Sequence, residues 1–128
     1  MAQRPIELIL LRHVAATAAQ PMCLVDEQEV LLYCNEPAER LLGLRGDEVG
    51  ELRLPQRLAR LCPTDATGTL LDPAALSVRA VMREQRPAQQ TFEIVDRAGL
   101  ARRVVMTAFP IIRQGDRLLG AVAIFWGA

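Results

Sequence analysis

Few side chains in this sequence can perform chemistry, and the histidine and the cysteines come first among them. The chain has one histidine, His13, so any histidine-based triad would depend on that residue, and a site built from several histidines is ruled out. The cysteines Cys23, Cys34 and Cys62 are separated by 11 and 28 residues, which fits neither a zinc knuckle nor a thioredoxin-type motif. We therefore predict no metal site and expect His13 to be a solvent-edge or interface residue.

The charged residues argue against several other functions. All 15 basic residues are arginine, which excludes a Schiff-base lysine and a P-loop lysine. The 15 acidic residues bring the net charge to zero, and this argues against a nucleic-acid partner. Asp26, Asp96 and Asp116 fall in predicted turns, where capping explains them better than general acid–base catalysis does.

The enzyme alternative is a small isomerase or hydrolase with a cone-shaped α+β fold. Such an enzyme needs an Asp or a His that faces a deep pocket. The only histidine lies in the first predicted helix, and no acidic residue interrupts an inner strand face. We therefore expect a protein that is not an enzyme.

The chain carries no sign of a membrane or secretory segment. No apolar run approaches the ~18–20 residues that a bilayer requires. The apolar stretch Ile6–Ala19 is interrupted by Glu7, Arg12 and His13, unlike a signal peptide. Because an odd, sparse set of cysteines is typical of a reducing compartment, we predict a cytoplasmic protein without membrane insertion.

The length and the apolar content predict one domain whose first element is a helix. The chain has 128 residues and 51% apolar residues. A helix is predicted over residues 5–19, with Pro5 in its first turn, and it is apolar on more than one face. Either it is a simple core helix or a second copy of the chain covers its other side. In the second case the dimer interface comprises Ile6, Ile9, Leu10, Leu11 and Val14.

A β-hairpin is predicted next, over Met22–Asp26 and Glu29–Cys34. If Asp26 pairs with Glu29, Cys23 faces Leu32 and lies diagonal to Cys34. Diagonal neighbours are about 7–8 Å apart, which is poor geometry for a disulfide. We therefore expect free thiols.

The remaining pattern predicts helices followed by three antiparallel strands. Asn35 is a favoured N-cap for a helix over 36–42, and Gly43 supplies its left-handed end. A longer helix is predicted from Pro73 to about Gln85. The strands are predicted over Gln90–Asp96, Arg102–Ile112 and Leu118–Trp126. The last two are apolar on both faces, so the first helix, alone or with a partner's copy, is expected to cover the outer face. This order predicts an α+β fold.

Several segments together resemble a PAS domain. They are Leu24-Val25-Asp26, the run Tyr33-Cys34-Asn35-Glu36-Pro37 through Gly43, Phe92-Glu93-Ile94, Gly99, Thr107–Ile111 and Leu119–Phe125. The resemblance implies a five-stranded antiparallel sheet of order 2-1-5-4-3 with short helices on one face. It also implies an N-terminal cap and dimerisation helix over 1–19 and a PAS core over 20–128. Asn35 and Gly43 match the structural Asn and Gly of the family.

The function implied by this resemblance is sensory or regulatory. Such a module is usually part of, or partner to, a histidine kinase or a similar output protein in bacterial two-component signalling. A haem- or flavin-binding sensor is the alternative. Flavin photosensing uses a cysteine in an Asn-Cys-Arg-Phe context, and Arg60-Leu61-Cys62-Pro63 lacks it, so we expect Cys62 to be a buried structural thiol. The helix over 73–85 contains no haem-ligating histidine. No cofactor is predicted.

A pocket for a small organic ligand is the other feature that the family suggests. The candidate lining residues are Leu24, Leu32, Leu42, Val78, Met82, Phe92, Ile94, Met106 and Ile124. The alternative, which we favour, is that these side chains simply fill the core, because every small domain must fill its centre. Arg79 and Arg83 could bind a carboxylate ligand if one of them turned inward, although such arginines more often form a solvated face.

Overall fold

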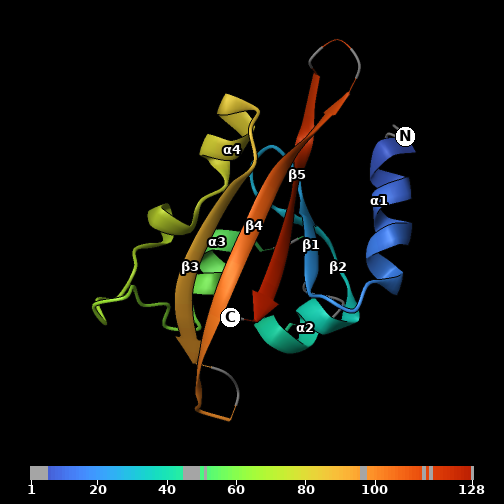
Figure 1. The fold of residues 1–128 in the computed structure, drawn as a ribbon. Helices are drawn as coiled ribbons and strands as arrows, with labels where there is room; N and C mark the ends of the chain where they lie inside the picture. Colours follow the sequence, from blue (N-terminus) through green and yellow to red (C-terminus); the bar gives the residue numbers. More distant parts are fainter. Residues whose placement is uncertain are drawn as a thin grey trace.

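A five-stranded antiparallel sheet is the centre of the computed structural model, which describes residues 6–44, 50, 52–95, 98–113, 115 and 117–127 (Figure 1). The strands follow the order β2-β1-β5-β4-β3, so the predicted α+β class and strand order are confirmed. The strands are β1 Met22–Val25, β2 Leu31–Cys34, β3 Ala88–Val95, β4 Ala101–Arg113 and β5 Arg117–Gly127. The helices are α1 Ile6–Thr17, α2 Glu36–Leu42, α3 Leu54–Ala59, the 3₁₀ helix η2 Pro73–Leu76, and α4 Arg79–Glu84. Pro5, Asp96 and Asp116 lie outside the described residues.

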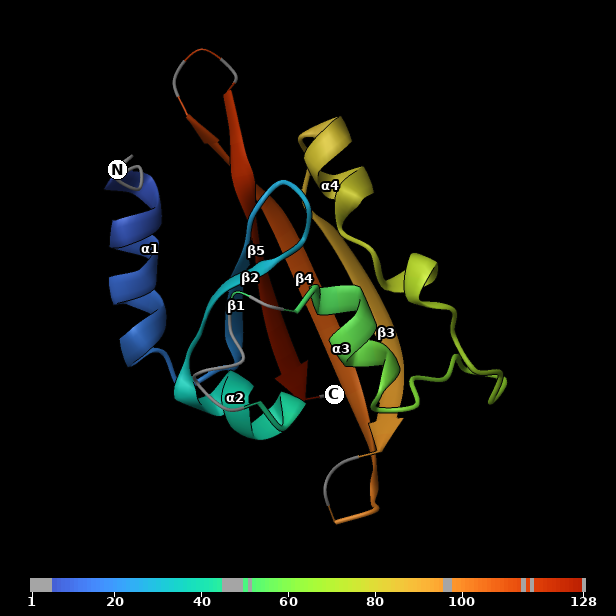
Figure 2. The same cartoon turned by 180° about the vertical axis from the view of Figure 1, so that it is seen from behind.

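The sheet separates two apolar layers. The short helices α2, α3 and α4 cover one face, and α1 lies against the opposite face beside β1 and β2 (Figures 1 and 2). The inner cluster comprises Cys23, Val25, Leu31, Cys34, Ala38, Leu42, Leu44, Leu54, Leu58, Leu76, Val78, Val81, Met82, Phe92, Ile94, Val104, Met106, Ala108, Ala121, Ala123 and Phe125. The outer cluster comprises Leu8, Ala15, Met22, Leu24, Ile111, Leu119 and Val122, with Leu11, Ala18, Leu32, Tyr33, Phe109 and Ile124 against it. The prediction that the first helix covers the outer face is confirmed.

The described helices are all too short to cross a bilayer. No helix in the described part of the chain combines the length and the apolar character that a membrane span requires.

The β1–β2 hairpin has a different register from the predicted one. Asp26 pairs with Val30 rather than with Glu29, because Glu29 adopts a left-handed conformation with φ 68° and adds a third residue to the loop. A bulge between Leu24 and Val25 shifts the register once more. Cys23 therefore lies directly opposite Cys34, and the predicted diagonal arrangement is wrong.

The predicted helix from Pro73 to Gln85 is interrupted. It forms the single turn of η2 and then α4, with Ser77 extended between them (φ −69°, ψ 141°). In a continuous helix the Val78 N–H would bind the carbonyl four residues earlier, but here it donates to the Glu29 carboxylate at 2.6 Å. Asp72 caps η2 by accepting a hydrogen bond from the Ala74 N–H at 2.9 Å. A long-range contact therefore replaces the local helical one.

Gly120 is required by the close approach of β5 to β1. Its φ is 151°, and a Cβ atom built there would overlap the carbonyl oxygen of Val25. Gly127, near the end of the same strand, has nothing within 4 Å of a built Cβ. The two glycines therefore form a matched pair for substitution.

We predict that Gly120→Ala lowers the free energy of unfolding by about 2 kcal/mol or more, because the added methyl group must displace backbone. Gly127→Ala should change it by less than about 0.5 kcal/mol. Urea unfolding of both variants followed by circular dichroism measures the difference. Equal stabilities would show that β1 and β5 are not packed this closely.

Candidate functional site

The nine predicted pocket residues do not line one pocket. Six of them belong to the inner cluster: Leu42, Val78, Met82, Phe92, Ile94 and Met106. Leu24, Leu32 and Ile124 lie on the outer side of the sheet, packed with α1. Side chains alternate between the faces of a strand, so Leu24 points away from the face that its neighbours Cys23 and Val25 occupy. The expectation of one common pocket is therefore wrong for these three residues.

A small inner cavity lies at the edge of the inner cluster, between α4 and the strands β3 and β4. Its volume is about 180 Å³. This inner cavity is lined by Ser77, Val78, Val81, Ala88, Gln89, Gln90, Met106 and Ala108. Val78 and Met106 are the only two predicted pocket residues among them. Most of the predicted residues on this face fill core volume.

The two arginines predicted as polar ligand contacts are both exposed on α4. Neither lines the inner cavity. Arg79 instead directs its Nε to Glu29 Oε2 at 3.3 Å, and its side chain remains 61% exposed. Arg79 therefore belongs to a different polar group of residues.

That group centres on Glu29, a buried carboxylate that the sequence reading missed. The Glu29 side chain is 4% exposed although it stands at a hairpin tip. Its Oε1 accepts hydrogen bonds from the Ser77 hydroxyl at 2.8 Å and from the Val78 N–H at 2.6 Å. Glu29 thus joins the β1–β2 hairpin to the start of α4, about fifty residues further along the chain. Nothing in the local sequence distinguishes it from the solvated Glu27 of the same turn.

A polar pocket of about 410 Å³ opens beside Glu29. Its lining consists of Glu29, Arg53, Pro55, Gln56, Pro73, Ala74, Ser77 and Arg79. Two arginines and one buried carboxylate therefore line the same pocket. Such a surface offers donors to a polar or anionic molecule, and no predicted pocket residue except Arg79 contributes to it.

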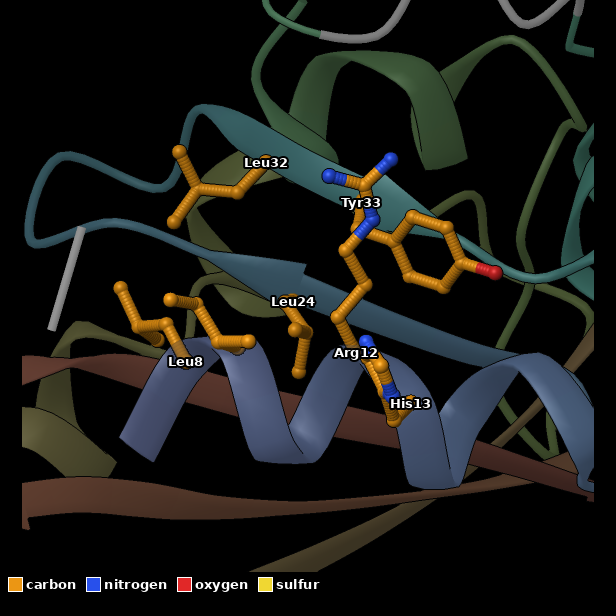
Figure 3. Close-up of a pocket in the computed structure, with 7 residues that line it drawn as sticks. Leu8, Arg12, His13, Leu24, Leu32 and Tyr33 are labelled. Carbon is orange, nitrogen blue, oxygen red and sulfur yellow. The ribbon is translucent and has the colours of Figure 1, made fainter. Parts of the chain in front are cut away.

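A third cavity, the outer groove, lies between α1 and the β1–β2 hairpin (Figure 3). Its volume is about 140 Å³, and Leu8, Ile9, Arg12, His13, Leu24, Leu32 and Tyr33 line it. Arg12 extends from α1 over the ring of Tyr33, with 5.0 Å between the guanidinium carbon and the ring centroid. His13 is exposed at its edge. The groove therefore combines an apolar floor with a cationic and aromatic rim.

Four of the five residues predicted for a dimer interface form an exposed apolar stripe on α1. The exposed fractions are 63% for Ile6, 44% for Ile9, 58% for Leu10 and 59% for Val14. The fifth, Leu11, is half-buried against the outer cluster. The helix thus uses one side for the fold and leaves the apolar stripe uncovered.

Asn35 and Gly43 occupy the structural positions predicted for them. Asn35 caps α2 by accepting a hydrogen bond from the Ala38 N–H at 3.0 Å. Gly43 ends the same helix in a left-handed conformation with φ 66°. Asn35 is also fully buried, and its side-chain amide donates hydrogen bonds to the carbonyls of Ala15 and Gln20. These two bonds hold the end of α1 in place.

The cysteines differ in their surroundings. Cys62 is exposed, so the prediction of a buried thiol is wrong; it follows the end of α3 in a left-handed conformation with φ 51°. Cys23 and Cys34 are buried in the inner cluster, and the structure has free thiols at all three positions. Among the described residues no group of three His, Cys, Asp or Glu side chains is arranged to hold a metal ion.

Comparisons with known proteins agree on one fold. The family model described as PAS fold matches residues 10–125. The PAS domain of Bordetella pertussis BvgS superposes with a TM-score of 0.73 and 18% identity, covering 97% of this chain and 88% of that one. A PAS domain from a two-component sensor histidine kinase gives 0.62 and 12%, covering 96% and 97%. The Vibrio cholerae VqmA dimer, a LuxR-type receptor with a target DNA, gives 0.70 and 17%, covering 97% of this chain but only 52% of that one. No curated protein sequence matches the chain.

We predict that Glu29→Ala destabilises the protein by about 2–3 kcal/mol, because the Val78 N–H and the Ser77 hydroxyl lose their shared acceptor. Amide exchange at the start of α4 should also become faster. The matched control is Glu27→Ala, an exposed carboxylate in the same turn, which should be neutral within about 0.5 kcal/mol. Chemical unfolding with hydrogen-exchange mass spectrometry measures both effects. If the two variants were equally stable, Glu29 would not hold α4.

Proposed function

The chain belongs to the PAS fold family, and on that premise we propose that it is a cytoplasmic sensory or regulatory module of bacterial signal transduction that acts as a homodimer through α1. Domains of this family are generally sensory rather than catalytic. A histidine kinase or a similar output domain would transmit the signal, and the likeness to a PAS domain of a two-component sensor histidine kinase supports this.

The exposed stripe of α1 is the observation that carries the proposal. Large apolar side chains rarely gather on the surface of a monomer unless a partner covers them. The stripe runs beside the outer groove, whose floor is also apolar, so one surface presents both a ridge and a hollow. We propose a second copy as the partner because a two-fold axis would place the apolar stripe of each copy against the outer groove of the other.

Ligand sensing is the second part of the proposal. Sites for drug-sized ligands enclose about 300–1,000 Å³, more than the 180 Å³ of the inner cavity. For the inner cavity, this favours a small organic ligand, or none, over the alternative of a haem or flavin sensor. The enzyme alternative receives no support from the buried carboxylate, because Glu29 already binds Ser77 and Val78.

The expectation of no nucleic-acid partner stays a prediction, because a domain of similar fold occurs in VqmA, which has a target DNA. The zero net charge describes this domain and says nothing of an output domain.

We predict that Leu10→Glu converts a dimer into a monomer, because it places a charge in the middle of the apolar stripe that the proposed dimer would bury. Leu70→Glu is the matched control, since Leu70 is 65% exposed on a loop remote from α1 in sequence. Size-exclusion chromatography with light scattering measures the mass of each variant. A dimer that survives Leu10→Glu, or is lost equally with Leu70→Glu, would refute this interface. Leu11→Glu is unsuitable, because Leu11 also packs in the fold.

We predict that the purified protein has no visible absorption band, because the inner cavity is too small for a haem or a flavin. Native mass spectrometry should find the mass of the chain alone or with a small organic adduct. A Soret or flavin band that copurifies with the protein in stoichiometric amount would contradict the prediction and favour the chromophore alternative.

A further inference from the structure

Two buried thiols face each other across the first hairpin. Cys23 on β1 lies directly opposite Cys34 on β2, and their Sγ atoms are 3.1 Å apart. Cys23 is completely buried, and Cys34 is 4% exposed. Both side chains point to the inner cluster, and neither the proposed interface on α1 nor the polar pocket involves them.

The hydrogen bonds of the hairpin place this pair where the two strands are closest. The Asn35 N–H donates to the Met22 carbonyl at 3.1 Å, so Met22 and Asn35 form a hydrogen-bonded pair. Hydrogen-bonded and non-hydrogen-bonded pairs alternate along an antiparallel ladder, which makes Cys23 and Cys34 a non-hydrogen-bonded pair. The Cα atoms of such a pair are about 4.5 Å apart, within the range that disulfides span. The backbone can therefore accept a bond between them with little movement.

We propose that Cys23 and Cys34 are a site of oxidative modification, at which a peroxide converts the two thiols into an intramolecular disulfide that thiol reductants reverse. Intracellular disulfides are often transient and redox-sensing, and a preformed pair suits that use.

The surroundings assign a different role to each thiol. The pKa of Cys23 is raised well above its ordinary value by its hydrogen bond to Cys34, by burial and by the Coulombic effect of Cys34. Cys34 lies on β2, the edge strand of the sheet, and is the slightly exposed member of the pair. On these grounds Cys34 is assigned as the thiol that meets the oxidant and Cys23 as the resolving thiol.

The reaction balances in two steps. The Cys34 thiolate attacks one oxygen of hydrogen peroxide, the O–O bond breaks, and Cys34 sulfenic acid and hydroxide form; the hydroxide combines with the proton that Cys34 released. The Cys23 sulfur then attacks the Cys34 sulfur, the S–O bond breaks, and the hydroxyl leaves as water with the Cys23 proton. Two thiols are oxidised to one disulfide, and one peroxide is reduced to two molecules of water.

The position of the pair links its oxidation state to α1. Cys34 is next to Asn35 in sequence, and Cys23 is next to Met22, whose N–H binds the Asn35 side chain. A disulfide would therefore link β1 and β2 directly beside the Asn35 amide. That amide holds the end of α1 through the carbonyls of Ala15 and Gln20. Oxidation would therefore restrict the motion of Asn35, which binds the end of the dimerisation helix. Only this last consequence rests on the proposed function; the chemistry at the pair does not.

The test uses the full chain with Cys62→Ser, which removes the exposed thiol and leaves the pair. After treatment with hydrogen peroxide, the intact mass should fall by two hydrogen atoms. Proteolysis after Glu27 and Glu29 separates the two cysteines in sequence, so their peptides should stay joined only until a reductant is added. The melting temperature should rise by about 5 °C or more, and the Met22 and Ala38 amides, which bind Asn35 Oδ1, should exchange more slowly.

Three results would overturn the inference. The first is a pair that stays reduced under conditions that oxidise Cys62 in the unsubstituted chain. The second is a bond that forms between two chains instead of within one. The third is a disulfide that leaves the melting temperature unchanged or lowers it. Light scattering on the reduced protein tests the dimer separately, so a failure of the redox pair and a failure of the dimer can be distinguished.

Discussion

The side-chain amide of Asn35 is the interaction on which the arrangement of the other elements depends. It makes four hydrogen bonds while fully buried: it accepts from Met22 and Ala38 and donates to Ala15 and Gln20. These partners belong to the end of α1 and the segment after it, the start of β1 and the first turn of α2. A carboxylate of the same size could not replace it, because two carbonyl oxygens face the amide nitrogen.

Much of the fold could be predicted because local signals and face patterns agree. The Asn35 cap, the Gly43 end and the two-faced apolar strands each imply one arrangement, and the structure has all three. The hairpin register could not be predicted, since it depends on the left-handed conformation of Glu29, a residue that rarely adopts one. The same residue interrupts the predicted long helix by binding the Val78 N–H. A contact across about fifty residues leaves no local pattern in a single sequence.

The candidate site was harder to predict for a related reason. Side chains alternate between the two faces of a strand, and the sequence did not show which alternate set faces α1. Leu24, Leu32 and Ile124 lie on the face that α1 covers. The composition did indicate more apolar residues than one small core needs. The structure distributes this excess over two clusters and still leaves four large side chains of α1 exposed. This distribution agrees with the proposed contact between copies rather than with a larger internal pocket.

The two faces of the sheet are joined through the same short hairpin. Its inward side chains include Cys23 and Cys34 and lie in the inner cluster. The outward side chain of Leu24 forms part of the floor beneath α1. Neighbouring residues of β1 point to opposite faces, so its inner and outer side chains share one backbone. A signal that alters the inner layer need not cross a thick core to reach α1. This short path, with Asn35 at its end, makes the hairpin the natural connection between the inner layer and the surface of α1 proposed as the dimer interface.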